Sequence, residues 1–146
     1  PKSVDIAAIA KTIKVNGFEV LESREEIIVE RIKVFFLSII KELPIQRKNK
    51  ISTMISEELG KDYSSLSKVF SQSEHITIEK YFLKLKLEKV KEFIQDDTHS
   101  FSQIASMLDY SSINHLSGQF KQETGLSMSE YKTMFQSNRK PLDKIV

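Results

Sequence analysis

The side chains that could catalyse a reaction or bind a metal are scattered along this sequence. Its three histidines, His75, His99 and His115, lie far apart and have no cysteine partner, so they lack the spacing of a metal site. The adjacent acidic pairs Glu57-Glu58 and Asp96-Asp97 point apart on a helix or lie in a turn, which makes them poor acid–base couples. Four glycines are too few for a phosphate-cradling loop, and no serine sits in a strained turn with a histidine partner. We therefore expect no enzymatic activity and no metal or cofactor.

Composition sets broad limits on the class of protein. The chain has 146 residues, of which 40% are hydrophobic and 29% charged, so it can bury a core and fits one domain, or one domain with a small appendage. Cysteine is absent, and no apolar run is long enough to span a membrane or to resemble a secretion signal. We expect a cytoplasmic protein. The net charge of +2 leans only weakly toward polyanions, and the start at Pro1 rather than Met suggests a piece of a longer protein.

A stretch in the middle of the chain recurs in looser form about fifty residues later. This spacing carries Phe70 onto Phe120 and Tyr81 onto Tyr131. Each copy consists of a short apolar helix, a tight break and a second helix that opens on a capping residue. The sequence therefore predicts two copies of one helix-turn-helix unit.

In the first unit, apolar residues predict a helix over 51–59, which ends at Gly60-Lys61. Asp62 is placed to accept the free N–H groups of the next helix, 63–74. In a helix-turn-helix the second helix enters the major groove of DNA and reads base edges. The alternative for a single copy is an αα-hairpin that only packs helices together.

The second unit repeats the pattern. A helix over 101–108, capped by Ser100 or a neighbour, ends at Asp109-Tyr110, and Ser111 is expected to cap the second reading helix, 112–123. Between the units, apolar residues at helical spacing predict a bridging helix over 78–95. Eighteen residues at ~1.5 Å each give a strut of about 27 Å. That length is comparable with the ~34 Å repeat of the major groove.

These residues resemble the AraC/XylS transcriptional regulators, whose DNA-binding domain consists of two helix-turn-helix units bridged by a helix. The resemblance runs from about Asn49 to Phe135. Its most specific segments are 83–94, which looks like the bridging helix, and 101–108 with 120–131, which look like the second unit. The resemblance implies a bacterial regulator that binds double-stranded DNA.

Three residues depart from the family pattern. Asp109 stands where glycine is usual in the turn, and Met128 stands where proline usually begins the last helix. Gly118 stands where the second reading helix often carries arginine, so this chain lacks a side chain that reads bases or binds phosphate there.

The expected DNA contacts lie on the outer faces of the two reading helices. The resemblance places base-reading positions of the first helix at Ser64, Ser67 and Lys68. In the second helix the outward-facing base readers are Ile113, Asn114 and Ser117. Lysine can donate to guanine, asparagine can bond bidentately to adenine, and an apolar side chain can touch a thymine methyl. The expected phosphate contacts are Tyr63, Lys121 and Lys132.

The flanking segments complete the expected organisation. Residues 1–23 form a partial helix-strand appendage that resembles half of a ferredoxin-like domain. Its strand, Phe18 to Glu22, is expected to pair with the same strand of a second molecule, or with residues that precede Pro1 in a longer parent protein. Residues 24–136 form the tandem helix-turn-helix domain, and residues 137–146 a flexible basic tail.

Within the domain, Ser23 caps a first helix that ends near Glu42, and the last helix covers 126–135. The expected buried side of the first helix is Ile27, Ile28, Ile32, Phe35, Phe36, Ile39, Ile40 and Leu43.

The sequence thus predicts a mainly α fold, with two helix-turn-helix units on one bridging helix and a short helix-strand appendage. It predicts a sequence-specific DNA-binding regulator with no membrane partner and an unknown effector. The competing interpretation is a protein–protein adaptor, in which the tandem helices bind another protein and Gly118 marks a DNA-binding face that has decayed.

Overall fold

The computed structural model describes the backbone of residues 23–145 and the side chains of residues 23–136. All regular structure in that part of the chain is helical. The helices are α2 (Arg24–Lys41), α3 (Ile51–Leu59), α4 (Tyr63–Glu74), α5 (Ile78–Asp96), α6 (Phe101–Met107), α7 (Ile113–Thr124) and α8 (Met128–Ile145). The mainly α fold is therefore confirmed. The predicted helix-strand appendage, with its strand Phe18 to Glu22, falls on residues 1–22, outside the described residues.

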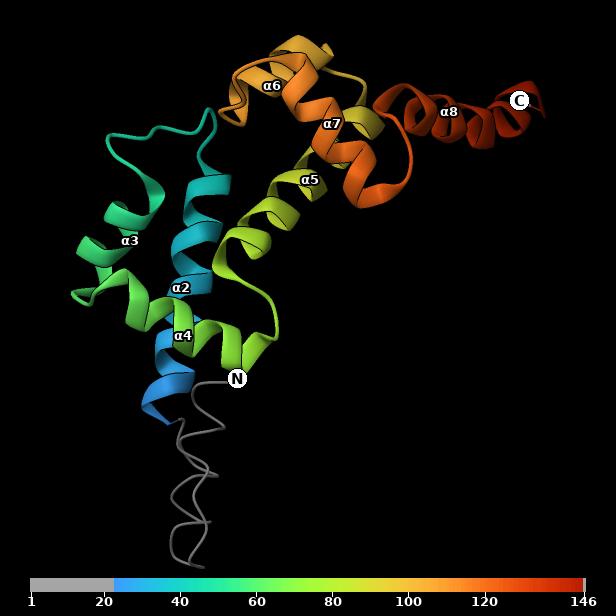
Figure 1. Cartoon of the computed structure of the whole chain (residues 1–146). Helices are drawn as coiled ribbons and strands as arrows, with labels where there is room; N and C mark the ends of the chain where they lie inside the picture. The colour runs from blue at the N-terminus through green and yellow to red at the C-terminus, as the bar shows by residue number, and fades with distance from the viewer. Residues whose placement is uncertain (1–22, 146) are drawn as a thin grey trace, which may run out of the picture.

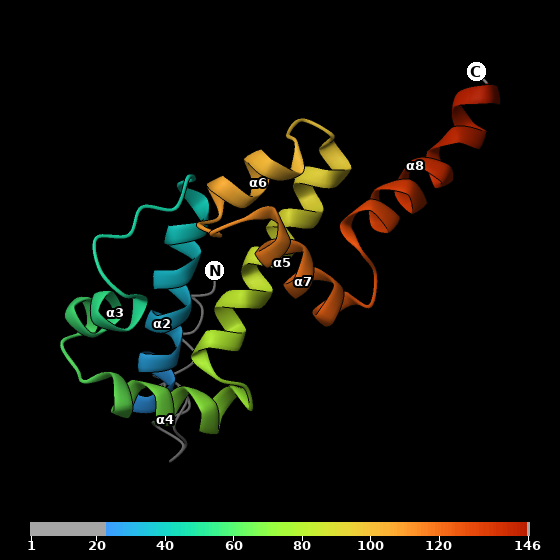
Figure 2. The same cartoon turned by 45° about the horizontal axis from the view of Figure 1, so that its top comes forward.

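Helix α5 joins the two units (Figure 1). The first unit packs α2, α3 and α4 together with the start of α5, and the second packs α6, α7 and the start of α8 against the remainder of α5. Figure 2, turned by 45°, shows the same two groups at opposite ends of α5 and shows α8 pointing away from them.

Each unit has its own buried core. The first core consists of Val29, Ile32, Phe36, Ile55, Leu59, Leu66, Phe70 and Ile78. The second core consists of Ile40, Leu87, Val90, Ile94, Ile104, Ala105, Leu108, Tyr110, Leu116, Phe120 and Met128. Phe82 and Leu85 of α5 pack against both cores, so the bridging helix is a structural part of each unit.

The internal repeat is visible in the packing of aromatic rings. The Phe70 and Tyr81 rings lie edge to face with centroids 5.3 Å apart and planes at 65°. Fifty residues later, the Phe120 and Tyr131 rings lie 5.7 Å apart at 71°. Both phenylalanines are fully buried. Each copy therefore uses an equivalent Phe–Tyr ring pair to hold its reading helix against the helix that follows it.

The predicted helix caps are largely confirmed. Ser23 and Ser100 each form a capping box, and the carboxylate of Asp62 accepts from the Ser65 N–H at 3.0 Å. Hydrogen bonds from Ser65 lower the pKa of the Asp62 carboxyl below its ordinary value. Gly60 ends α3 in the left-handed conformation, with φ of 69°, which is the role predicted for the break.

The predicted cap of α7 was wrong by one residue. Ser112, and not Ser111, has extended backbone and accepts from the His115 N–H at 3.0 Å. The Ser111 hydroxyl instead lies 3.3 Å from the ring Nδ1 of His115. The reason is that Asp109 adopts the left-handed conformation and Tyr110 turns into the core, which delays the start of the helix.

This correction gives a direct test in the second unit. Ser112→Ala removes a side-chain acceptor from the first turn of α7, and we expect it to lower the free energy of unfolding by about 1 kcal/mol. Ser111→Ala is the matched control and should cost clearly less. Urea denaturation followed by circular dichroism measures both. A larger loss for Ser111→Ala than for Ser112→Ala would contradict the observed cap.

Two further predictions about the helices need correction. In α2 the buried residues are Val29, Ile32, Phe36 and Ile40, whereas Ile27 is 45% exposed. Residues three or four apart lie on the same side of a helix. Val29 is three residues from Ile32, whereas Ile27 is five residues from it and lies on another side. The last helix begins at Met128 and runs to Ile145, well beyond the predicted end at Phe135, so the expected domain boundary at 136 lies inside α8.

Candidate nucleic-acid interface

The outer face of α4 carries the three predicted base readers. Ser64 and Lys68 are exposed, and Ser67 is half-buried between them. Leu66 and Phe70 on the opposite side are fully buried in the first core, and they fix the rotation of the helix. The structure therefore brings Ser64, Ser67 and Lys68 together on one accessible face. No described carboxylate forms an ion pair with Lys68, so its ammonium is free to bind another molecule.

The corresponding face of α7 carries the other three predicted base readers. Ile113 is 41% exposed, Asn114 is exposed, and Ser117 is half-buried, with its hydroxyl donating to the Asn114 carbonyl at 3.3 Å. The Asn114 side-chain amide makes no hydrogen bond to the described residues, which leaves both its donor and its acceptor available. A Cβ built on Gly118 meets no atom within 4 Å, so this departure from the family pattern leaves open space on the face.

The three predicted phosphate contacts differ in availability. Lys121 is exposed and has no ion pair with another described side chain. The Tyr63 hydroxyl donates to the Glu79 carboxylate, and burial together with this contact raises the pKa of Tyr63. Lys132 pairs with Asp97, with Nζ 3.1 Å from Oδ1. Tyr63 and Lys132 would therefore have to exchange these partners to bind phosphate.

Both reading helices lie on the viewer's side of Figure 1, α4 in front of α2 and α7 in front of α5. They are not splayed to opposite sides of the molecule, and neither is enclosed within it. Helix α5 has 19 residues and is therefore about 28 Å long.

Three contacts hold the units in this arrangement. The Arg47 guanidinium, in the linker between α2 and α3, binds the Asp109 carboxylate with Nε 2.5 Å from Oδ2. Lys80 of α5 binds Glu123 of α7 at 2.7 Å. The N–H of Ile45 donates to the carbonyl of Met107 at 2.8 Å. Sequence reasoning missed these contacts because their partners lie more than forty residues apart.

Asp109 explains one departure from the family pattern. Its φ is 64°, in the left-handed region where glycine carries no penalty and aspartate is tolerated. In return, its carboxylate reaches Arg47 from the other unit. The presence of an acidic residue at a turn position that favours glycine was the signal in the sequence, and it indicates a contact that glycine could not make.

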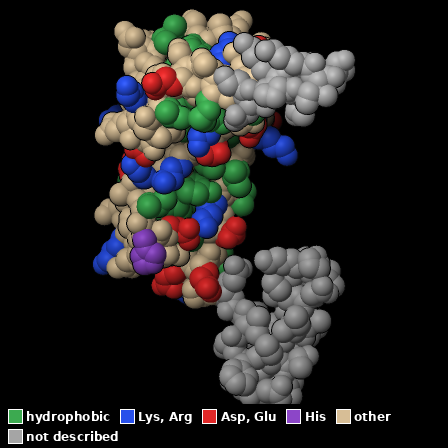
Figure 3. All heavy atoms as spheres, turned by 90° about the vertical axis from the view of Figure 1, so that its right-hand side faces the viewer, with side chains coloured by type: hydrophobic (Ala, Val, Ile, Leu, Met, Phe, Trp, Pro, Cys, Tyr) green, Lys and Arg blue, Asp and Glu red, His purple; other side chains and the backbone are tan. Residues whose placement is uncertain are grey.

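Charges of both signs are distributed over the surface. On the face shown in Figure 3, basic and acidic side chains alternate around small apolar patches, and no broad area carries a single sign. On this face, therefore, charge alone does not mark a site for a polyanion. In the described part of the chain, no group of three or more His, Asp or Glu side chains is arranged to hold a metal. Among the described helices, none is both long and apolar enough to cross a bilayer.

A family model described as a helix-turn-helix domain matches residues 55–134, which is more than half of the chain and includes both reading helices. The chain belongs to the AraC-type helix-turn-helix family. The match to this AraC-type domain covers α4, α5, α6 and α7, so the sequence resemblance to AraC/XylS regulators is confirmed. Members of this family are DNA-binding transcription regulators, and membership indicates double-stranded DNA as the class of partner.

Solved structures of bacterial proteins share the AraC-type fold. The C-terminal domain of AraT, a response regulator from Geobacillus stearothermophilus, is 21% identical with a TM-score of 0.67, over 77% of this chain and 88% of that one. A DNA-binding transcriptional dual regulator from Escherichia coli K-12 is 16% identical with a TM-score of 0.62, over 75% and 93%. A regulator with an AraC-type DNA-binding domain from Chromobacterium violaceum is 19% identical with a TM-score of 0.61, over 73% and 93%. No curated protein sequence gives a significant match to this chain.

Proposed function

We propose that this protein is a sequence-specific transcription regulator that inserts α4 and α7 into successive major grooves of double-stranded DNA. The observation that carries the proposal is the pair of exposed polar faces on α4 and α7, both on one side of the molecule (Figure 1). Helix α5, against which both units pack, is about 28 Å long, and the major groove repeats at ~34 Å.

Base reading is assigned unequally to the two helices. On α4, Lys68 can donate to guanine O6 and N7, while the hydroxyls of Ser64 and Ser67 discriminate little between bases. On α7, Asn114 can bond bidentately to adenine, Ile113 can contact a thymine methyl, and Ser117 can bond to either kind of base. Gly118 leaves α7 without a long side chain at that point, so α7 reads fewer bases than a family member with arginine there.

Phosphate binding falls mainly to Lys121 and to the first turns of the two reading helices. Lys121 has no carboxylate partner among the described residues, whereas Tyr63 and Lys132 must release Glu79 and Asp97. Backbone N–H groups at helix N-termini also bind phosphate well. These contacts fix the register of the protein on the duplex without reading its sequence.

Selection of bound duplexes from a random library tests the function. We expect one enriched site with two short conserved blocks about one helical turn apart. Affinity for that site should fall log-linearly with salt, with a slope of about −0.9 for each phosphate neutralised. Recovery of no enriched sequence, together with no salt-sensitive binding to any duplex, would contradict the proposal and favour the adaptor interpretation.

A further inference from the structure

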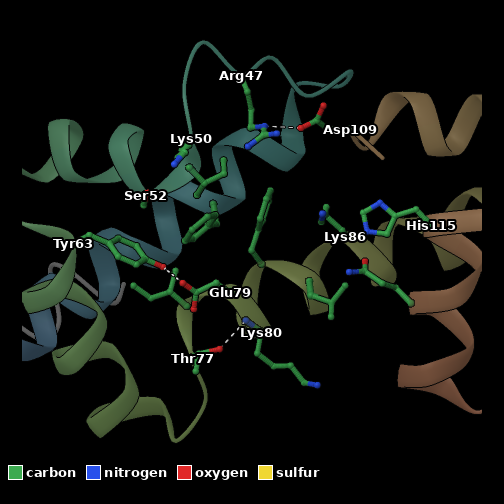
Figure 4. Close-up of a pocket in the computed structure, with 16 residues that line it drawn as sticks. Arg47, Lys50, Ser52, Tyr63, Thr77, Glu79, Lys80, Lys86, Asp109 and His115 are labelled. Atoms are coloured by element: carbon green, nitrogen blue, oxygen red, sulfur yellow. Dashed lines mark hydrogen bonds and ion pairs between the residues drawn. The ribbon is translucent and has the colours of Figure 1, made fainter. Parts of the chain in front are cut away.

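A hollow of about 610 Å³ lies between the two helix-turn-helix units. Figure 4 shows its walls: Lys50 and Ser52 at the start of α3, Tyr63 of α4, Lys86 of α5 and His115 of α7. Cavities of ~300–1,000 Å³ that combine apolar walls with a few polar groups are typical of small-molecule sites. The DNA-reading faces described above do not account for this hollow.

The charge inside the hollow is unbalanced. Four cationic side chains and two carboxylates line it. Both carboxylates are already engaged, Asp109 by Arg47 and Glu79 by the Tyr63 hydroxyl (Figure 4). Lys80 is paired with Glu123. Lys50 and Lys86 remain without a carboxylate partner among the described residues.

Lys86 is the more unusual of these two lysines. Its Nζ lies 4.3 Å from the centre of the Tyr110 ring and 4.9 Å from that of Phe82, and no described residue accepts a hydrogen bond from it. Burial lowers its pKa below the ordinary value, although Asp109 nearby acts in the opposite direction. A half-buried ammonium that contacts two aromatic rings and forms no ion pair lacks the direct anionic partner that normally compensates for the loss of water.

The remaining walls are apolar or incompletely satisfied. Phe36, Ile51, Ile78 and Leu83 supply apolar surface. The carboxamide of Gln119 also lines the hollow, and its Oε1 is buried without a hydrogen-bond partner in the described structure. The hollow thus offers cations, an unused polar group and an apolar wall within one volume.

We infer that the hollow binds a small organic anion with an apolar body, whose anionic group contacts Lys86 and Lys50. The apolar body packs against Phe82 and Leu83 of α5. Residues of both units line the hollow, so the bound anion contacts both units at once. This inference does not depend on DNA binding.

Fluorescence titration with 1-anilinonaphthalene-8-sulfonate tests the inference, because this probe joins an anionic group to an aromatic body. We expect saturable binding to one site on the full chain. Lys86→Met keeps the length of the side chain and removes its charge, and it should weaken binding about tenfold. Lys84→Met, at an exposed position on the same helix and outside the hollow, is the matched control and should leave binding unchanged.

The neutral analogue N-phenyl-1-naphthylamine separates charge from shape. It should bind the wild type and Lys86→Met equally, because it lacks the sulfonate. Circular dichroism and thermal unfolding establish that each variant is folded, and Lys50→Met replaces Lys86→Met if the latter is not.

Any one of the following results would overturn the inference. These are equal sulfonate binding by wild type and a folded charge-removing variant, an equal loss in Lys84→Met, or an equal loss for the neutral analogue. A Lys86→Met variant that loses DNA affinity while sulfonate binding is unchanged would assign the hollow to the DNA backbone and also overturn it.

Discussion

Replacing Phe120 with alanine should lower the free energy of unfolding by about 3–5 kcal/mol. Phe120 is fully buried in the second core, among Leu116, Leu108 and Met128, and its ring packs edge to face on Tyr131. Truncation leaves a cavity there and also removes the ring pair that holds α7 against α8. A domain of this size has a total stability of roughly 5–15 kcal/mol, so the loss is a large share of it.

Urea denaturation, followed by the helical circular dichroism signal, measures this loss in the free energy of unfolding. Met134→Ala is the control, because Met134 is a large apolar residue that is 47% exposed. Its effect should stay within about 0.5 kcal/mol. The equivalent change in the other unit, Phe70→Ala, should cost about as much as Phe120→Ala. Losses for the two phenylalanines no larger than that for Met134→Ala would contradict the described cores.

Combining Lys68→Ala with Asn114→Ala should reduce affinity for the selected DNA site by about 2–6 kcal/mol. Each change alone removes one base-reading side chain and should cost about 1–3 kcal/mol. The two residues lie on different reading helices and share no contact, so their effects should add. Additivity is expected only if α4 and α7 bind the same duplex at the same time.

Fluorescence anisotropy at one fixed salt concentration measures the two single variants and the double variant. Each is titrated with the selected duplex and with a random duplex of the same length. The loss should be confined largely to the selected duplex. An equal loss on both duplexes would show that these side chains touch phosphate rather than base edges.

The fold could be predicted from the sequence where local signals agreed. Helix α3 has its predicted bounds, and α5 ends within one residue of them, because apolar periodicity, a left-handed glycine and a capping hydroxyl or carboxylate all act within a few residues. The position of α7 depended on Asp109 and Tyr110, where the turn conformation is set by contacts with other elements, so the cap at Ser112 was missed. The predicted end of the last helix at Phe135 was also wrong, because Gln136, Arg139 and Lys140 are good helix formers and the helix continues to Ile145.

The candidate site was predictable only in part. The exposed positions on α4 and α7 followed from which residues the core requires, namely Leu66, Phe70, Leu116 and Phe120. Partners that lie far apart in the sequence could not be foreseen. The Tyr63 hydroxyl is bound to Glu79, and Lys132 to Asp97, because α4 and α8 meet α5 in space. The hollow is formed by both units together and has no signature in either one.

The spacing between the two halves of the selected DNA site tests the central claim most directly. B-DNA makes a turn in about 10–10.5 base pairs, so inserting five base pairs between the halves moves one groove to the other side of the duplex. If α5 holds α4 and α7 at a fixed separation, affinity should fall to that of a site with one half deleted. An inserted site that binds as tightly as the original would contradict the account.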